Sequence, residues 1–139
     1  AIRRQRQMCI RDRIEKAIKT AQLEDVRKRL INNLSKGYKQ RVGLAQAVLG
    51  DPETIILDEP TRGIDAGART DVYNIIKGLS KKGLAVLLIS SDMEEIIELS
   101  DRAVTIHQGR LNCEFDRADI NQENLTKASF GVIGKEKES

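Results

Sequence analysis

The chain has few aromatic residues, few cysteines and no long apolar run, and each shortage argues against a class of protein. It contains no Trp, two Phe and two Tyr in 139 residues, which leaves few rings to stack on nucleic-acid bases. Cys9 and Cys113 lie far apart, without the spacing of a metal site. The uncharged run 42–50 is much shorter than the roughly 18 apolar residues of a membrane span. We therefore expect no nucleic-acid partner, no zinc site and no membrane-spanning helix.

A further absence concerns a motif. The chain nowhere contains G-x-x-x-x-G-K-[ST], the glycine-rich loop whose backbone N–H groups surround nucleotide phosphates. A nucleotide that binds here would need phosphate contacts from outside this chain.

Charge is distributed unevenly. The formal net charge is +3, yet residues 31–50 contain no acidic residue and the chain after residue 50 is acidic overall. A basic front half can indicate nucleic-acid contact. Because aromatic residues are scarce, we interpret it as a solvated basic face.

The first residues stand apart from the rest. The sequence QRQMCIRDR (5–13) follows neither the strand period nor the helix period, and it resembles translated sequencing-adapter DNA. We interpret residues 1–12 as a non-native or disordered leader and exclude them from the fold argument. A frayed natural terminus is the alternative.

Strands and helices are expected to alternate along the remainder. Apolar spacing predicts helices at 14–21, 25–30, 36–49, 70–80, 91–99 and 122–130. Continuous apolar runs predict strands at 54–57 and 84–89, buried on both faces of a parallel sheet, and 103–115 reads as a hairpin. The apolar residues of the 36–49 helix nearly encircle its second half, so we expect it to be largely buried. The fold class is α/β with a mainly parallel sheet.

Two adjacent carboxylates, Asp58 and Glu59, follow the first expected strand. Ligands of parallel α/β sheets bind at the carboxyl ends of strands. The chain can turn there, before Pro60, and direct both carboxylates into one site. One would serve Mg²⁺ and the other would orient or deprotonate an attacking water. The alternative for Asp58 is an ordinary helix cap.

A second candidate site lies at the start of the 36–49 helix. Ser35 and Gly37 occupy this start, where free N–H groups and the helix dipole favour an anion such as phosphate. Taken alone, Ser35 is more simply explained as a helix cap.

The string LSKGYKQR (34–41), a helix, and then IILDEPT (55–61) resemble the signature motif and Walker B segment of ATP-binding-cassette (ABC) ATPases. The resemblance implies that Ser35, Gly37 and Gln40 contact ATP bound to the opposite subunit. It also implies that Asp58 serves Mg²⁺ and that Glu59 is the catalytic base. The segment Gly63-Ile64-Asp65 is similar to the D-loop, so the resemblance assigns Asp65 to the nucleotide interface.

The same resemblance implies a partial P-loop NTPase fold. Residues 13–50 would end a helical subdomain, 51–134 would form the part of the ATPase core from Walker B onward, and 135–139 would be a disordered tail. The implied cofactors are ATP and Mg²⁺. The implied partners are a second ATP-binding cassette, transmembrane permease subunits and a solute-binding protein. The implied location is the cytoplasmic face of the cell membrane, as a peripheral subunit.

Ser91 departs from the family pattern, because ABC ATPases commonly have a histidine there that senses the γ-phosphate. The resemblance gives Ser91 this catalytic position but leaves full hydrolytic competence open. Residues 61–69 and 88–96 resemble the second cassette of ribose, galactose and autoinducer-2 importers. Residues 34–48 are more similar to single-cassette exporter or gliding-type ATPases. A chimeric join near 58–61 would account for both likenesses.

A sugar or autoinducer-2 importer is therefore the expected function. The alternatives are an exporter cassette, a non-catalytic cassette that completes a partner's ATP site, and an ATPase of DNA repair. The last would need a long coiled coil, and no heptad run is visible.

Overall fold

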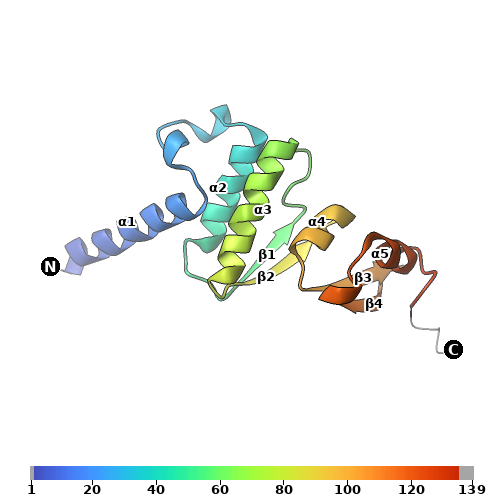
Figure 1. The fold of residues 1–139 in the computed structure, drawn as a ribbon. Helices are drawn as coiled ribbons and strands as arrows, with labels where there is room; N and C mark the ends of the chain where they lie inside the picture. The colour runs from blue at the N-terminus through green and yellow to red at the C-terminus, as the bar shows by residue number, and fades with distance from the viewer. Residues whose placement is uncertain (1, 135–139) are drawn as a thin grey trace. The chain divides into compact units, whose positions relative to one another are not determined.

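A computed structural model describes residues 2–134, with side chains from Cys9 onward. The chain forms two compact units, residues 1–89 and residues 90–139, drawn in Figure 1. The elements of the N-terminal unit are α1 (Ile2–Thr20), η1 (Glu24–Val26), η2 (Ile31–Asn33), α2 (Lys36–Val48), β1 (Thr54–Asp58), α3 (Ala66–Lys81) and β2 (Ala85–Ile89). Those of the C-terminal unit are α4 (Met93–Leu99), β3 (Arg102–His107), β4 (Arg110–Asp116), η3 (Arg117–Asp119) and α5 (Gln122–Ser129).

A parallel pair of strands and a buried helix stripe form the core of the N-terminal unit. β1 pairs with β2 from Thr54 opposite Ala85 to Asp58 opposite Ile89. The apolar stripe of α3 is buried as its spacing predicts, through Val72, Ile75, Ile76 and Leu79. On β1, Ile55 and Leu57 are buried with it.

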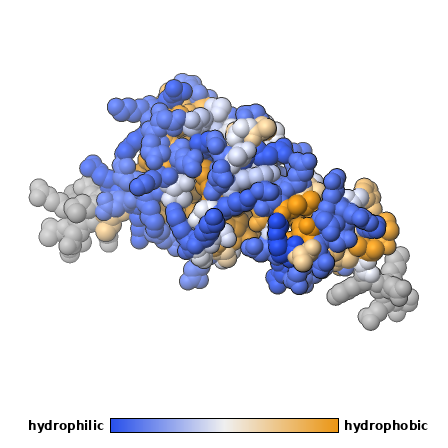
Figure 2. Space-filling view, in the orientation of Figure 1, coloured by the Kyte–Doolittle hydropathy of each residue, from blue (hydrophilic) through white to orange (hydrophobic). Residues whose placement is uncertain are grey.

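The other face of this sheet is exposed, so the expectation that both faces are buried was wrong. Ile56, Leu87 and Ile89 keep 65%, 53% and 49% of their surface accessible. Side chains alternate between the two faces of a strand, and among the described residues α3 lies against one face. Apolar side chains reach the surface in the space-filling view (Figure 2).

α2 lies beside α3 (Figure 1) but is less buried than the sequence predicts. Gly37, Arg41 and Leu44 are its buried residues. A second stripe, through Tyr38, Val42 and Ala45, packs against a cluster of Ala21, Leu23, Val26 and Leu34. Outside these two narrow contact stripes, the residues of α2 are half-buried or exposed.

The segment before α2 also differs from expectation. The helix predicted at 25–30 is absent; the structure has the short turns η1 and η2 instead. The reason is burial, since Val26 packs inward while residues 27–33 are exposed and supply no apolar stripe. α1 continues without a break through residue 12, so the described part of the leader is helical. That residues 1–12 are non-native stays a prediction.

The C-terminal unit contains the predicted hairpin. β3 and β4 pair antiparallel, with an irregularity between Thr105 and Ile106. Gln108 and Gly109 connect them with φ of 49° and 75°, as a tight hairpin turn requires. Ala103, Ile120 and Leu125 form the buried cluster of this unit. The α/β fold class is confirmed, although its parallel part consists of β1 and β2. The expected tail, 135–139, lies outside the described residues.

Candidate functional site

The backbone turns sharply where the two carboxylates follow β1. Asp58, the last residue of the strand, is exposed. Glu59 has φ of 47°, and a non-glycine residue in this left-handed region costs about 1–3 kcal/mol. The Glu59 N–H donates to the Ile89 carbonyl at 2.8 Å, and the Arg62 N–H donates to the Glu59 carbonyl at 3.1 Å. A strained conformation at an acidic residue, held by two backbone hydrogen bonds, is the kind of feature found at functional sites.

The donor set suits a magnesium–nucleotide complex better than a closed metal centre. Within the described residues, no three His, Cys, Asp or Glu side chains come together to hold a metal. Mg²⁺ in nucleotide enzymes commonly takes one or two carboxylates together with phosphates and waters. Asp58 and Glu59 are the two carboxylates of this turn that could provide that protein share.

Ser35 caps α2, as its position predicts. Its Oγ accepts a hydrogen bond from the Tyr38 N–H at 3.3 Å. A serine hydroxyl can accept and donate at once, so this bond leaves the hydroxyl hydrogen available to a ligand. The first turn of α2 holds no acidic residue, which keeps this helix end favourable to an anion.

Gly37 lies on the face of α2 that contacts α3. A Cβ added at Gly37 would stand 2.6 Å from the Ala68 Cβ, closer than side chains tolerate. The lack of a side chain therefore permits the close approach of the two helices, a reason that the sequence did not reveal. One residue earlier, the Lys36 ammonium lies over Gly63, where an added Cβ would be 2.5 Å from Nζ.

Asp65 caps α3 in the same way that Ser35 caps α2. Its Oδ1 accepts a hydrogen bond from the Ala68 N–H at 3.0 Å. This bond, more than any other cause, lowers the pKa of the Asp65 carboxyl. The cap is thus fully present above the ordinary carboxyl pKa and is lost as the pH falls through the lowered one. The starts of α2 and α3, marked by Ser35 and Asp65, are held close through Gly37 and Ala68.

The remaining two predicted site residues occupy different units. Gln40 is half-buried on α2. Ser91 is exposed and belongs to the C-terminal unit, in the turn before α4. That helix starts at Met93, two residues later than expected, because Asp92 caps it by accepting from the Glu94 N–H at 3.0 Å.

The sequence did not single out Arg41 and Asp71, which connect α2 to α3. Arg41 is 8% exposed and forms an ion pair with Asp71. Its Nη1 also donates to the Gln22 carbonyl at 3.2 Å. Arg41 stands one helical turn after Gly37 on the same face, and this spacing was the available signal. Nothing in the sequence pointed to Asp71.

Replacing Gly37 with alanine should destabilise the chain by about 1–3 kcal/mol, since the new methyl group would push α2 and α3 apart. Urea unfolding of the purified chain measures this effect. Gly43→Ala is the matched control on α2, because a Cβ there would meet nothing within 4 Å; it should stabilise by about 0.5–1 kcal/mol. Adding Ala68→Gly should restore most of the loss. Equal effects at residues 37 and 43 would contradict the close helix contact.

The sequence matches known transporter subunits. Residues 3–62, which include Ser35 and Glu59, match the family model described as "ABC transporter"; the match begins inside the expected leader. The chain is 46% identical over 104 residues to ribose import ATP-binding protein RbsA 2 of Rubrobacter xylanophilus, covering 75% of this chain and 20% of that protein. It is 41% identical over 106 residues to RbsA of Clostridium perfringens, covering 76% and 21%. The chain therefore spans about a fifth of the length of these curated relatives.

The fold matches solved ATP-binding cassettes. An ATP-binding cassette of an ABC transporter, MJ1267, aligns with a TM-score of 0.77 at 21% identity, over 87% of this chain and 48% of that one. The cbiO1 protein of Clostridium perfringens, part of the ABC transporter complex cbiONQ, aligns with a TM-score of 0.74 at 23% identity, over 88% and 49%. At these identities the likeness shows the fold alone.

Of the helices between residues 2 and 134, none has the length and apolar character needed to cross a membrane. Over residues 3–62 the sequence is similar to the ABC transporter family, and the fold resembles that of solved ATP-binding cassettes.

Proposed function

We propose that this chain supplies the signature helix and the Walker B carboxylates of an ATP-hydrolysing cassette that powers import of a sugar. The strained turn that carries Glu59 at the end of β1 is the structural observation that supports catalysis most. The sugar is suggested by the relatives at 41–46% identity, which are named ribose import proteins. An autoinducer-2-like solute is the other import substrate that the sequence suggests.

Each site residue has a proposed role that its position allows. Magnesium–ATP, when bound, supplies the phosphoanhydride bond that water cleaves. Asp58, exposed at the strand end, would hold the metal. The Glu59 carboxylate would orient the attacking water and accept its proton.

The start of α2 would act on a different nucleotide. Ser35 would donate its hydroxyl hydrogen to the γ-phosphate of ATP held by the opposite cassette, with Gly37 and Gln40 beside it. Asp65, at the start of α3, would couple the two nucleotides across the interface. These roles require a second cassette. We propose permease subunits and a solute-binding protein as the further partners, at the cytoplasmic face of the membrane.

A non-catalytic cassette is the second candidate, and Ser91 is the observation that favours it. A serine can donate a hydrogen bond but carries no imidazolium charge. In that case Ser35 and Gly37 would complete the partner's site, while the site that contains Glu59 would hydrolyse ATP slowly or not at all.

ATP binding by the purified 139-residue chain tests whether nucleotide binding needs a phosphate-binding loop from another segment. Because the sequence holds no phosphate-binding loop, titration calorimetry should detect no micromolar affinity. The completed cassette, meaning this chain joined to a segment with that loop, should bind ATP. A micromolar Kd for the 139-residue chain alone would contradict the proposal.

A further inference from the structure

α2 and α3 contact each other at successive levels along their lengths. Nearest the helix starts, Gly37 packs against Ala68, where even one extra methyl group would clash. One turn further along each helix, Arg41 forms its ion pair with Asp71. We call these four residues the α2–α3 clamp. The spacing of four residues on α2 and three on α3 places both contacts on the facing sides of the helices.

Arg41 is itself held from several sides. Its guanidinium carbon lies 4.8 Å from the centre of the Tyr38 ring, a cation–π distance. The Tyr38 hydroxyl donates to Asp25, and this hydrogen bond is the main reason that the Tyr38 pKa is raised. Gln22 has φ of 53°, and its carbonyl accepts from Arg41. A buried cation that is fixed by a ring, a carbonyl and a carboxylate has little freedom to move.

The clamp lies directly behind the two helix starts to which nucleotide contacts are assigned. Ser35 precedes Gly37 by two residues, and Asp65 precedes Ala68 by three. With Gly37 against Ala68, the caps at Ser35 and Asp65 cannot shift separately without opening the helix pair. Misplacement of a catalytic contact by about 1 Å can cost two orders of magnitude in rate.

We propose that Arg41 and Asp71 are positioning residues, which hold the start of α2 at a fixed position relative to the start of α3. The two helix starts would then reach the nucleotide interface together. The expected effect on ATP hydrolysis rests on the proposed function. The alignment of α2 with α3 does not, because it is a property of this chain alone. Neither side chain touches a nucleotide in this account.

Spin-label distances test the register without any nucleotide. Labels at the exposed residues Lys39 on α2 and Thr70 on α3, with Cys9 and Cys113 changed to serine, report the helix separation by double electron–electron resonance. Asp71→Asn should broaden the distance distribution about two-fold, because one side of the helix pair is released. Asp71→Glu should restore the original width. An unchanged width with Asp71→Asn would overturn the proposal.

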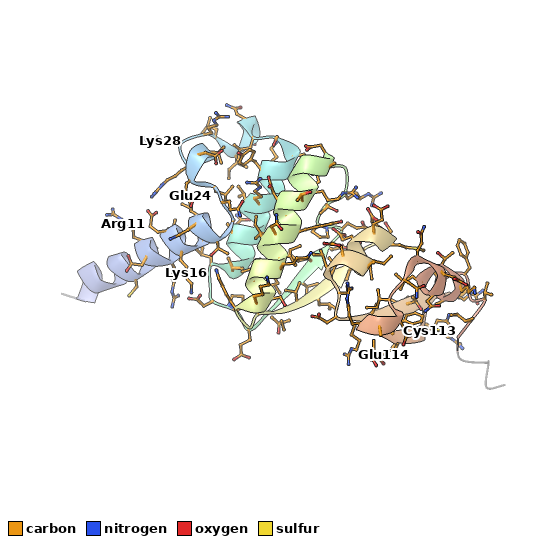
Figure 3. The ribbon with its side chains drawn as sticks, viewed as in Figure 1. Arg11, Lys16, Glu24, Lys28, Cys113 and Glu114 are labelled. Carbon is orange, nitrogen blue, oxygen red and sulfur yellow. The ribbon has the colours of Figure 1, made fainter. Side chains whose placement is uncertain are left out.

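Lys16→Gln is the matched control. It removes the exposed ion pair between Lys16, labelled in Figure 3, and Asp51 at 2.6 Å in the same unit, and it should leave the label distance unchanged. Broadening by this variant as well would overturn the proposal, since any lost ion pair would then loosen the helices. If circular dichroism shows that Asp71→Asn is unfolded, Arg41→Lys replaces it, because lysine keeps the charge but lacks the guanidinium fork. Broadening of the label distance by Arg41→Lys then supports the proposal, and an unchanged width overturns it.

ATP hydrolysis by the completed cassette tests the functional consequence. Asp71→Asn should lower kcat by about ten-fold or more, while KM for ATP stays nearly constant. If Asp71→Asn broadens the label distance but leaves kcat unchanged, the positioning role is overturned. If the unsubstituted completed cassette hydrolyses no ATP, the proposed function fails, while the label distances still decide the register.

Discussion

Replacing Glu59 with glutamine in the completed cassette should lower ATP turnover by about 10²–10⁴, the usual contribution of a positioned general base. Glutamine keeps the size of the side chain but cannot accept the proton of the attacking water. The backbone bonds that shape the turn, from Glu59 to Ile89 and from Arg62 to Glu59, do not involve the carboxylate. The fold and ATP binding should therefore persist, and steady-state phosphate release measures the loss.

Glu53→Gln is the control for this substitution. Glu53 is an exposed carboxylate just before the other end of β1, so its neutralisation changes the net charge equally without touching the turn. It should leave turnover within about two-fold, as expected for a surface substitution away from the chemistry. Near-normal turnover with Glu59→Gln would remove Glu59 from the role of base and favour the non-catalytic cassette.

Changes at Ser35 should have a comparable effect on the nucleotide of the opposite cassette. Ser35→Arg places a long side chain where the γ-phosphate is proposed to approach. It should lower turnover at that site by about 10² or more, the cost of one lost phosphate donor. Ser80→Arg, at an exposed position near the end of α3, adds the same side chain elsewhere and should leave turnover unchanged.

Ser35→Asp separates the phosphate contact from the helix cap. Aspartate is as good an N-cap as serine, so the hydrogen bond with the Tyr38 N–H should survive and the free energy of unfolding should hardly change. The carboxylate, however, has no hydrogen to donate and repels phosphate. Turnover should fall as steeply as with Ser35→Arg. Full activity in Ser35→Asp would reduce Ser35 to an ordinary cap.

The elements that apolar periodicity defines strongly were predictable from the sequence. The stripe of α3, the β3–β4 hairpin and the cap at Ser35 follow from local spacing and turn chemistry, which act over a few residues. The exposed face of β1 and β2 was not predictable, because an apolar run shows only that a strand is suited to burial. The prediction of a helix at 25–30 was wrong for a related reason, because short turns are enough to bury Val26 and Leu34.

The candidate site was predictable in its residue types more than in its geometry. Asp58, Glu59, Ser35 and Gly37 could be selected because their order and spacing resemble a known family. The left-handed backbone at Glu59 and the contact of Gly37 with Ala68 could not, since both depend on tertiary packing. Asp71 was hidden for the same reason, because nothing in the local sequence shows that this half-buried carboxylate pairs with Arg41 on another helix.

We propose that Glu59 and Ser35 of one chain serve different nucleotides. Two completed cassettes joined in tandem test it, with Ser35→Arg and Glu59→Gln placed either in the same copy or in different copies. If the claim is right, substitutions in different copies damage the same site twice and leave the other site intact, so about half the activity should remain. Substitutions in the same copy damage both sites, so nearly all the activity should be lost. The reverse order of activities would show that both residues serve one pocket and would contradict the account.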